Sequence, residues 1–351
     1  MKHSVWIAGK RIGENQPAYL IAEMSANHLQ DYERAKKILL AAKEAGADAV
    51  KLQSYRPDTI TIDCRGEDFM ASKGGLWEGQ NLYELYEKAY MPWEWHEGLF
   101  EYGREIGITV FSSPFDFTSI ELLERLRAPA YKIASYEIVD IPLIRRAAKT
   151  GKPLILSTGI ASVADIQLAL ETCKAEGNEN VILLKCVSQY PTPYEALNLR
   201  TIPNMAETFD CVVGLSDHSM GSAVDVAAVT LGSKVIEKHF TLRRSDGGVD
   251  SAFSMEADEF AAMVKDIRNV EAALGRCTYE LTERQRQGRK VARSLYVVRD
   301  IAAGETLTAD NIRSIRPGHG ISPRYYEAVL GKMAKIPLKR GMALQWEYIN
   351  L

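Results

Sequence analysis

The chain lacks any pattern of paired cysteines. Its five cysteines are scattered, odd in number and never spaced as Cys-x-x-Cys: Cys64, Cys173, Cys186, Cys211 and Cys277. A disulfide framework needs an even set at short spacings, so this class of protein is excluded. Isolated thiols of this kind are typical of a reducing compartment, and we therefore expect a cytoplasmic protein.

Long apolar runs and an excess of positive charge are also missing. No stretch approaches the ~18 apolar residues of a membrane span, and residues 1–16 have no apolar segment of the kind found in signal peptides. Lys and Arg number 43 against 46 Asp and Glu, which gives a formal net charge of -3. Nucleic-acid-binding proteins carry a basic field, so we expect neither nucleic acid nor a membrane as a partner.

The 351 residues alternate short β-rich runs with amphipathic stretches. The β-rich runs lie at 18–24, 49–54, 108–113, 130–135, 153–158, 181–187, 211–217 and 234–240. The clearest helical stretch covers 31–46, with an Asp at its start and a Gly at its end. Eight strand–helix units predict a closed parallel (β/α)8 TIM barrel. A doubly wound sheet is the alternative, but no GxGxxG motif follows the first strand.

The residue pattern changes after the last barrel helix, which we place at 256–275: a polar segment is followed by short β-like runs separated by glycines. We therefore assign residues 1–276 to the barrel, the polar residues 277–290 to a linker, and residues 291–351 to a small second domain with glycine turns. A long insertion at 55–95, rich in Tyr and Trp, follows the second strand. Such an insertion often shapes a substrate pocket, although we expect most of its aromatic residues simply to pack it onto the barrel.

Polar side chains end every predicted strand. Catalytic groups of TIM barrels come from the carboxyl ends of the strands, so these side chains are expected to meet in one site at the barrel mouth. They are Glu23, Lys51, Gln53, Ser112, Ser113, Lys132, Ser135, Ser157, Thr158, Lys185, Ser188, Ser216, His218, Glu237 and His239.

Two of these side chains, Lys51 and Lys132, end apolar runs. A buried ammonium group is destabilising unless an opposite charge compensates it. Pairing with Glu23 or Glu237 would be a purely structural role for either lysine. The hydroxyl groups that surround them favour instead a cradle for a small polyanion, and phosphoenolpyruvate, with a carboxylate and a phosphate, suits such a site. These hydroxyls belong to Ser113, Ser135, Ser157 and Ser216.

His218 and His239 end the seventh and eighth predicted strands, which are neighbours in a closed barrel. Side-chain alternation puts each histidine on the same face as the residue two positions before it, Ser216 or Glu237. A histidine pair by itself is more often structural or a proton carrier. With a carboxylate beside it, we favour a divalent metal, Mn²⁺ or Mg²⁺ with Co²⁺ as a further option, completed by substrate oxygens. His28 is a further candidate for the mouth, whereas His3 and His96 are expected to be surface or packing residues.

Nine motifs that follow one another along the chain resemble the sialic acid synthase family. They are AEMSANH (22–28), DAVKLQ (48–53), FSSPFD (111–116), YKIAS (131–135), LSTG (156–159), YPTP (190–193), GLSDH (214–218), VIEKHF (235–240) and IRPGHG (315–320). The resemblance extends to the C-terminus, where residues 291–351 resemble the antifreeze-like SAF domain of that family.

Within the family, the resemblance is closest to the pseudaminic acid synthase branch. It is carried by SANH, YRPDTIT (55–61), LWEG (76–79), PWEWH (92–96) and SPRYY (322–326). The chain departs from the sialate branch at Leu29-Gln30, where that branch usually has Asn-Gly, and at Ser188, where it often has Asn.

The resemblance implies a metal-dependent condensation of phosphoenolpyruvate with an N-acetylated amino sugar. The expected sugar is 2,4-diacetamido-2,4,6-trideoxy-L-altrose, and the products are pseudaminic acid and phosphate, released by C–O cleavage. Catalytic roles are implied for Glu23, Lys51, Glu237 and Arg316, and metal ligation for His218 and His239. Substrate contacts are implied for Asn27, Gln53, Ser113, Lys132, Ser135, Ser157, Ser188, Tyr190, Ser216 and Asp250.

Arg316 is expected to reach the barrel of a partner subunit in a domain-swapped homodimer, although a surface salt bridge is an alternative role for it. Three other functions stay open. The first is an N-acetylneuraminate or legionaminate synthase, whose sugar substrate would be N-acetylmannosamine or 2,4-diacetamido-2,4,6-trideoxymannose. The second is a synthase for an eight-carbon keto acid and the third is a non-catalytic carbohydrate-binding protein. A synthase for an eight-carbon keto acid usually lacks the SAF-like tail. A non-catalytic carbohydrate-binding protein would be expected to lose part of the Lys, Glu and His set.

Overall fold

The computed structural model describes residues 1–71 and 76–350 and divides the chain into two units, Met1–Gly275 and Arg276–Leu351. Residues 72–75, which belong to the insertion predicted at 55–95, lie outside the described residues. Within the described part of the chain, no helix is long and apolar enough to cross a membrane.

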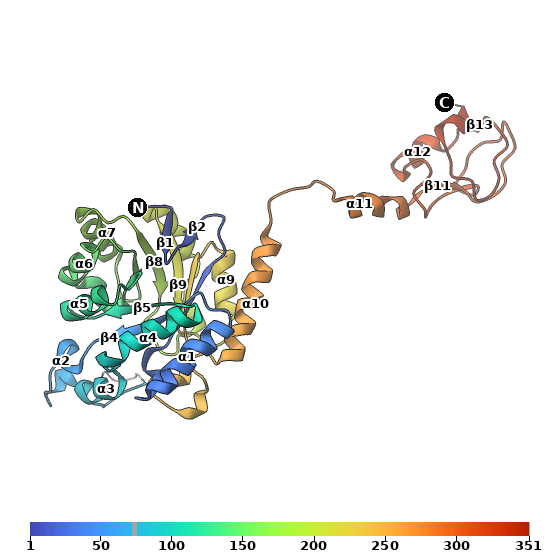
Figure 1. Cartoon of the computed structure of the whole chain (residues 1–351). Helices are drawn as coiled ribbons and strands as arrows, with labels where there is room; N and C mark the ends of the chain where they lie inside the picture. The colour runs from blue at the N-terminus through green and yellow to red at the C-terminus, as the bar shows by residue number, and fades with distance from the viewer. Residues whose placement is uncertain (72–75, 351) are drawn as a thin grey trace. The chain divides into compact units, whose positions relative to one another are not determined.

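A closed barrel of eight parallel strands forms the first unit (Figure 1). The strands are β3 (Tyr19–Glu23), β4 (Ala49–Ser54), β5 (Thr109–Pro114), β6 (Tyr131–Ile133), β7 (Leu154–Ser157), β8 (Val181–Cys186), β9 (Val212–Asp217) and β10 (Val235–His239). They follow chain order, and β10 closes the barrel against β3. The predicted TIM barrel is confirmed, each predicted run overlaps one strand, and the doubly wound alternative is excluded.

Helices surround the barrel between successive strands. They are α1 (Tyr32–Glu44), α4 (Trp93–Ile106), α5 (Phe117–Arg125), α6 (Ile141–Ala148), α7 (Val163–Ala175), α8 (Thr201–Phe209), α9 (Ala223–Thr230) and α10 (Ala257–Leu274). Helix α1 begins where its sequence predicts, because the Asp31 side chain accepts hydrogen bonds from the backbone N–H groups of Glu33 and Arg34. Its buried face, with Ile38 and Leu39, joins the core between the helices and the strands.

The interior of the barrel is apolar toward the amino ends of the strands and polar at their carboxyl ends. The apolar part is built by Tyr19, Ile21, Ala49, Phe111, Ala130, Ile155, Ile182, Leu184, Val212 and Val235. A hairpin that the sequence analysis did not predict, β1 (Ser4–Ile7) and β2 (Lys10–Gly13), adds Val5, Ile7 and Ile12 to this cluster. Because strand side chains alternate, the residues two positions beyond the apolar layer also point inward, and these form the site described below.

The insertion after β4 contains α2 (Pro57–Ile60) and α3 (Leu82–Ala89). Tyr55 is buried between Tyr86 and Phe115, with ring centroids 5.6 and 5.2 Å away. The indole N–H of Trp93 donates to the carbonyl of Tyr55 at 3.2 Å. These contacts agree with the packing role expected for most aromatic residues of the insertion.

The second unit has a hydrophobic core of its own, which includes Leu295, Val297, Leu307, Ile312 and Leu338. Its elements are α11 (Glu283–Gly288), β11 (Ser294–Val297), β12 (Ile312–Ile315), α12 (Tyr326–Val329), β13 (Met333–Ala334) and β14 (Ile349–Asn350). Helix α11 falls in the segment that the sequence analysis assigned to a polar linker.

Candidate active site

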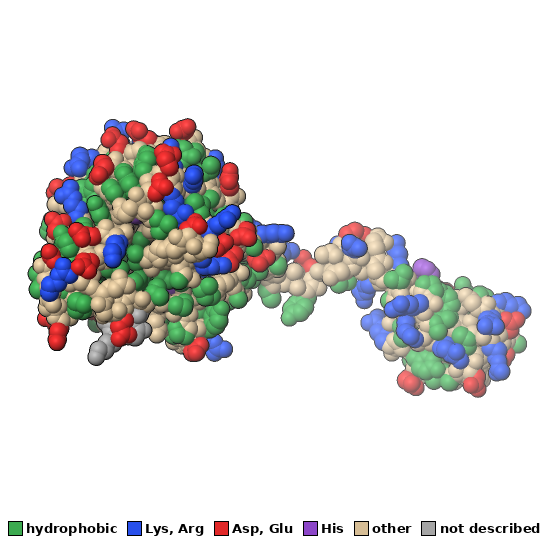
Figure 2. Space-filling model, turned by 90° about the horizontal axis from the view of Figure 1, so that it is seen from below, with side chains coloured by type: hydrophobic (Ala, Val, Ile, Leu, Met, Phe, Trp, Pro, Cys, Tyr) green, Lys and Arg blue, Asp and Glu red, His purple; other side chains and the backbone are tan. Residues whose placement is uncertain are grey.

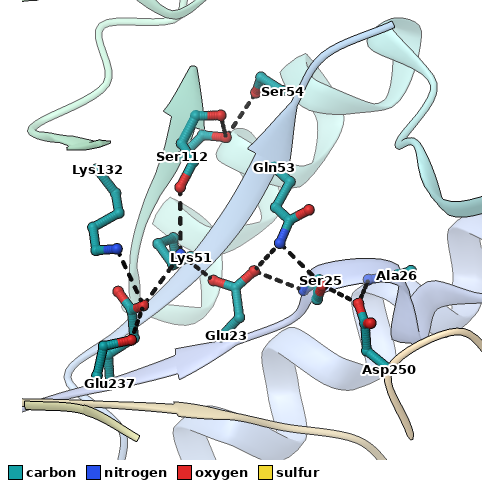
Figure 3. A network of polar contacts seen from close by, with 12 residues as sticks. Glu23, Ser25, Ala26, Lys51, Gln53, Ser54, Ser112, Lys132, Glu237 and Asp250 are labelled. Atoms are coloured by element: carbon teal, nitrogen blue, oxygen red, sulfur yellow. Dashed lines mark hydrogen bonds and ion pairs between the residues drawn. The ribbon is translucent and has the colours of Figure 1, made fainter. Parts of the chain in front are cut away.

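Lys51 lies at the centre of a buried ion network at the carboxyl ends of the strands (Figure 3). Its Nζ is 2.8 Å from Glu23 Oε2 on β3 and 3.3 Å from Glu237 Oε1 on β10. The same Nζ donates to Ser113 Oγ at 3.3 Å. On β6, Lys132 places its Nζ 3.5 Å from Glu237 Oε1. The pairing that would give the lysines a structural role is therefore present, and the charges of two lysines and two carboxylates compensate one another.

The two carboxylates of this network have opposite acidities. Burial raises the pKa of Glu23, Lys51 offsets this only in part, and the negative charge of Glu237 adds to the increase. Burial also opposes ionisation of Glu237, but Lys132, Lys51 and a hydrogen bond of 3.1 Å from Ser216 Oγ lower its pKa overall. Carboxyl groups whose pKa values are pushed apart divide the acid and base roles. Glu23 is the one that holds a proton more readily, and Glu237 stays anionic.

Three serine hydroxyls and Gly159 form a cradle beside the network. Ser135 Oγ accepts the backbone N–H of Gly159 at 3.1 Å, and a Cβ on Gly159 would come within 2.2 Å of Ser188 Oγ. The buried hydroxyls of Ser157 and Ser188 have no hydrogen-bond partner within the described residues. Because a buried hydroxyl without a partner costs free energy, the cradle favours a ligand rich in acceptor oxygens, such as a phosphate or a carboxylate.

His218 and His239 face one another with ring centroids 5.3 Å apart. His218 Nδ1 lies 3.1 Å from the carbonyl of Val187, so this nitrogen carries a proton. Burial lowers the pKa of His218, but Cys186 and the Val187 carbonyl raise it overall, so Nε2 binds a cation after its own proton has been released. Burial, the neighbouring His218 and Lys51 together hold the pKa of His239 well below its ordinary value, so its ring is neutral. Its Nδ1 is buried without a partner among residues 1–71 and 76–350.

This histidine pair fits a divalent cation, because His239 offers a ring nitrogen without a partner among the described residues and the contact with Val187 orients the ring of His218. Over the described residues, however, no group of three or more His, Cys, Asp or Glu is arranged to hold a metal ion. A cation at the pair would therefore take most of its ligands from substrate or water oxygens.

Cys186 is a site residue that the sequence analysis missed. It points into the barrel from β8, with its Sγ 4.0 Å from His218 Nδ1. Burial acts to raise the pKa of the thiol, but His218, Ser135 and Lys132 lower it to about 7. The alternation along β8 was the available signal, since Cys186 follows the inward-facing Leu184 by two positions. By the same alternation, the assignment of Lys185 to the mouth is wrong, because this residue lies on the outer face of β8.

Glu137 is a second residue that the sequence analysis missed. It lies in a short 3-10 helix, η3 (Ser135–Val139), directly after β6. Burial raises the pKa of Glu137 to about 7, although Lys132 acts in the opposite direction. Its Oε2 is buried without a hydrogen-bond partner in the described part of the chain. The sequence contains no motif that distinguishes Glu137, because a single Glu after a strand is common in proteins.

An aromatic wall and a polar chain complete the mouth. The Tyr190 ring packs on His218 at 4.3 Å between centroids, and Phe253 and Trp77 pack on Tyr190 at 5.2 and 5.7 Å. The polar chain runs through Ser25, as Figure 3 shows. Gln53 Nε2 donates to Glu23 Oε1 at 2.9 Å and to Ser25 Oγ at 3.0 Å, and Ser25 Oγ donates to Asp250.

Four predicted residues lie elsewhere. Ser112 faces outward, where its hydroxyl and His96 Nε2 contact Ser54 Oγ at 2.7 and 2.8 Å. Asn27 Nδ2 donates to Phe240 O and Ser254 Oγ, both at 2.9 Å, so its amide ties loops together. His28 is fully buried, and its ring packs edge-on against Trp95 with centroids 5.7 Å apart. Arg316 is exposed and belongs to the second unit.

A closed parallel barrel that gathers lysines, carboxylates and histidines at its strand ends is the arrangement of a (β/α)8-barrel enzyme. The chain belongs to the NeuB family, whose model matches residues 38–279. The model of the SAF domain matches residues 292–349, which confirms the resemblance of the tail.

Curated relatives and solved structures agree with this assignment. The chain is 46% identical to a pseudaminic acid synthase of Campylobacter jejuni, over 94% of this chain and 96% of that protein. It is also 46% identical to a pseudaminic acid synthase of Helicobacter pylori, over 95% and 98% of the two chains. An N-acetylneuraminic acid synthetase of Leptospira borgpetersenii, solved in complex with citrate, superposes with a TM-score of 0.71 at 30% identity, covering 82% of this chain and 96% of that one.

Proposed function

We propose that this chain is a pseudaminic acid synthase, which condenses phosphoenolpyruvate with 2,4-diacetamido-2,4,6-trideoxy-L-altrose and releases phosphate. The observation that carries the proposal is the similarity to two pseudaminic acid synthases over 94% and 95% of the chain. The lysine–carboxylate network beside an unsatisfied hydroxyl cradle supports the same chemistry.

Phosphoenolpyruvate is proposed to lie between the lysines and the serine cradle. Lys51 and Lys132 provide positive charge at one side, while Ser157 and Ser188 offer hydroxyl donors at the other. The sugar is proposed to lie toward Gln53, Tyr190 and Asp250, where a polar chain and an aromatic face meet. A sugar presents both hydroxyl groups and apolar C–H surfaces, so both features suit it.

The proposed reaction forms one C–C bond and exchanges the phosphate oxygen on carbon 2 for an oxygen from water. Carbon 3 of phosphoenolpyruvate bonds to the aldehyde carbon of the open-chain sugar, and the aldehyde oxygen takes a proton. Water adds to carbon 2 and gives up one proton. The new hydroxyl on carbon 2 then gives up its proton and becomes the keto oxygen as the bond between carbon 2 and the phosphate oxygen breaks, and the phosphate leaves as inorganic phosphate. Glu23 and Glu237 are the proposed carboxyl groups for these protons, and the lysines stabilise the anionic oxygens from fixed positions.

A divalent cation, Mn²⁺ or Mg²⁺ with Co²⁺ as a further option, is proposed at His218 and His239. When bound, such a cation supplies a Lewis acid for the carbonyl oxygen of the sugar. Charge supports the proposal, because Glu23 and Glu237 pair with Lys51 and Lys132 and so offset much of the positive charge of these lysines. A polyanionic substrate therefore needs further positive charge nearby.

The second source of positive charge is proposed to be Arg316 of a partner subunit in a domain-swapped homodimer. Met1–Gly275 carries 29 Lys and Arg against 39 Asp and Glu, whereas Arg276–Leu351 carries 14 against 7. Figure 2 shows the Lys and Arg side chains of the C-terminal unit gathered on its visible face. Units of opposite net charge attract one another.

Exposed apolar side chains in the loops at the barrel mouth support the same assembly. The segments that follow β6, β7 and β8 expose Tyr136 by 59%, Val139 by 54%, Val163, the first residue of α7, by 68% and Tyr194 by 59%. Large apolar side chains exposed at one end of a barrel are suited to burial in an interface.

The test is to incubate the protein with phosphoenolpyruvate, Mn²⁺ and a panel of sugars, and to follow phosphate release and product mass. The panel contains N-acetylmannosamine and the altro and manno forms of the 2,4-diacetamido-2,4,6-trideoxy hexose. Turnover with the altro sugar alone is expected. Turnover with N-acetylmannosamine or the manno sugar instead would identify an N-acetylneuraminate or legionaminate synthase. The absence of phosphate release with every sugar, from folded and metal-loaded protein, would favour a binding protein or a different synthase.

A further inference from the structure

Lys238 lies directly behind the histidine pair, on the outer face of the barrel. It stands between Glu237 and His239 on β10, and side-chain alternation turns it away from the mouth. On β9, Asp217 stands between the inward-facing Ser216 and His218 in the same way, and the register pairs Lys238 with Asp217. The ion pair of Lys238 and Asp217 therefore lies on the outer face of the two strands, and the two histidines lie on the inner face.

The surroundings of Lys238 form a closed polar cluster. Its side chain is 2% exposed and pairs with Asp217, and its Nζ lies 3.4 Å from Asp225 Oδ2 in the first turn of α9. The same Nζ donates to the carbonyl of Ser219 at 2.8 Å and to that of Gly221 at 2.9 Å. Asp217 in turn accepts the backbone N–H and the hydroxyl of Ser219, each at 2.9 Å.

This cluster holds the loop that carries His218. Strand β9 ends at Asp217, so the sheet ladder no longer fixes the backbone at His218. Beyond the strand, the carbonyl of His218 accepts the N–H of Thr192 at 3.0 Å, and Nδ1 contacts Val187 O. The ties from Lys238 to residues 219 and 221 are the contacts that restrain the following chain against β10. His239 needs no such help, because it is part of β10 and its register partner is Glu23.

We infer that Lys238 is a positioning residue, which holds His218 opposite His239 from the outer face of the barrel and so preorganises the pair for a divalent cation. This inference rests on the proposed metal site and goes beyond it, because Lys238 touches neither substrate nor cation. Residues behind metal ligands typically change metal affinity by about 10- to 100-fold when they are replaced.

The test compares Lys238→Met with the wild-type protein by two readouts. Manganese binding, measured from the EPR signal of free Mn²⁺, is expected to weaken by about 10-fold or more. The ¹H–¹⁵N spectrum of the histidine side chains is expected to lose the signal of a single His218 tautomer. The conservative variant Lys238→Arg, which keeps the charge, is expected to recover a large part of both.

A matched control separates positioning from general stability. Asn178 is also 2% exposed, and its Nδ2 ties the carbonyls of Ala148 and Lys152, at 3.2 and 2.8 Å, at the opposite end of the barrel. Asn178→Ala is expected to destabilise the protein while manganese affinity and the histidine spectrum stay unchanged. If Lys238→Met does not fold, the double variant Asp217→Asn/Lys238→Met removes both charges of the pair and takes its place.

Two results would overturn the inference. One is a folded Lys238 variant with wild-type manganese affinity and an unchanged His218 signal. The other is an equal loss of affinity in Asn178→Ala, which would mean that stability alone is measured. Wild-type protein that binds no Mn²⁺ would refute the metal site, and the histidine spectrum would still decide whether Lys238 holds His218.

Discussion

Glu23 and Lys51 are register partners on neighbouring strands, and their side chains meet inside the barrel with Oε2 and Nζ 2.8 Å apart. Neither side chain is more than 5% exposed. A buried ion pair of this kind adds little net stability, but removal of one partner leaves an uncompensated buried charge. The pair is therefore better understood as part of the site than as a stabilising contact.

The first prediction concerns this pair. Lys51→Met is expected to lower the free energy of unfolding by about 3–5 kcal/mol, because Glu23 loses its cation. The double variant Glu23→Gln/Lys51→Met should recover much of that loss, since Glu237 keeps Lys132. Urea denaturation of the wild type, both single variants and the double variant measures the effect. Additive losses in the double variant would contradict the coupling.

The second prediction uses Gly159. A Cβ there would lie 2.2 Å from Ser188 Oγ and 2.7 Å from Ser135 Oγ. Gly159→Ala should therefore fill the cradle and raise the KM for phosphoenolpyruvate by about 10-fold or more, while the sugar KM changes little. Gly288→Ala, where a Cβ meets nothing within 4 Å, is the matched control. An unchanged KM for phosphoenolpyruvate would place this substrate elsewhere.

The third prediction is a pH dependence that arises from Glu137. Its pKa is about 7 in the folded protein against an ordinary value of 4.5, so the folded state binds this proton more tightly than the unfolded state. The contribution to stability is full below pH 4.5 and is lost as the pH rises through 7. Glu137→Gln cannot ionise and should lose less stability than the wild type over this window, as urea midpoints at several pH values will show. Parallel pH curves of the two proteins would contradict the assignment.

The fourth prediction tests the histidine pair. His218→Ala and His239→Ala should each abolish manganese binding and turnover, because the protein supplies only two ligands to the proposed site and one histidine is too few to hold the cation. Isothermal titration with Mn²⁺, alongside circular dichroism to establish folding, measures this. Variants that keep both metal affinity and full activity would show that the histidines serve another purpose.

The fifth prediction tests the domain swap. Arg316→Ala should remain folded and lose activity, because the residue is exposed. An equal mixture with His239→Ala, refolded or co-expressed, should regain about a quarter of the wild-type activity, since half of the dimers are mixed and each of these has one intact site. No recovery in mixed dimers would argue that Arg316 acts within its own chain or not at all.

The sequence by itself determined the barrel and the identity of most residues at its mouth. Strand length, helix capping at Asp31 and the spacing of apolar runs are local properties, so the eight strands could be placed within a residue or two. The position of Lys51 at the end of a predicted strand, and the alternation of side chains that relates Glu237 to His239 and Ser216 to His218, assigned these residues to one site. On β8 the same alternation places Cys186 on the inner face with Leu184, and Lys185 on the outer face.

Only the tertiary structure decided which charged side chains form ion pairs and how each ion pair shifts the pKa values of its carboxyl groups. The sequence left open whether Lys51 pairs with Glu23 or Glu237, and in the barrel it pairs with both, while Lys132 reaches only the second. That choice depends on the shear of the barrel and on side-chain reach, which no local pattern encodes. The raised pKa of Glu137 and the cluster of Lys238 behind the histidines arise for the same reason, because burial and long-range contacts are properties of the packed molecule.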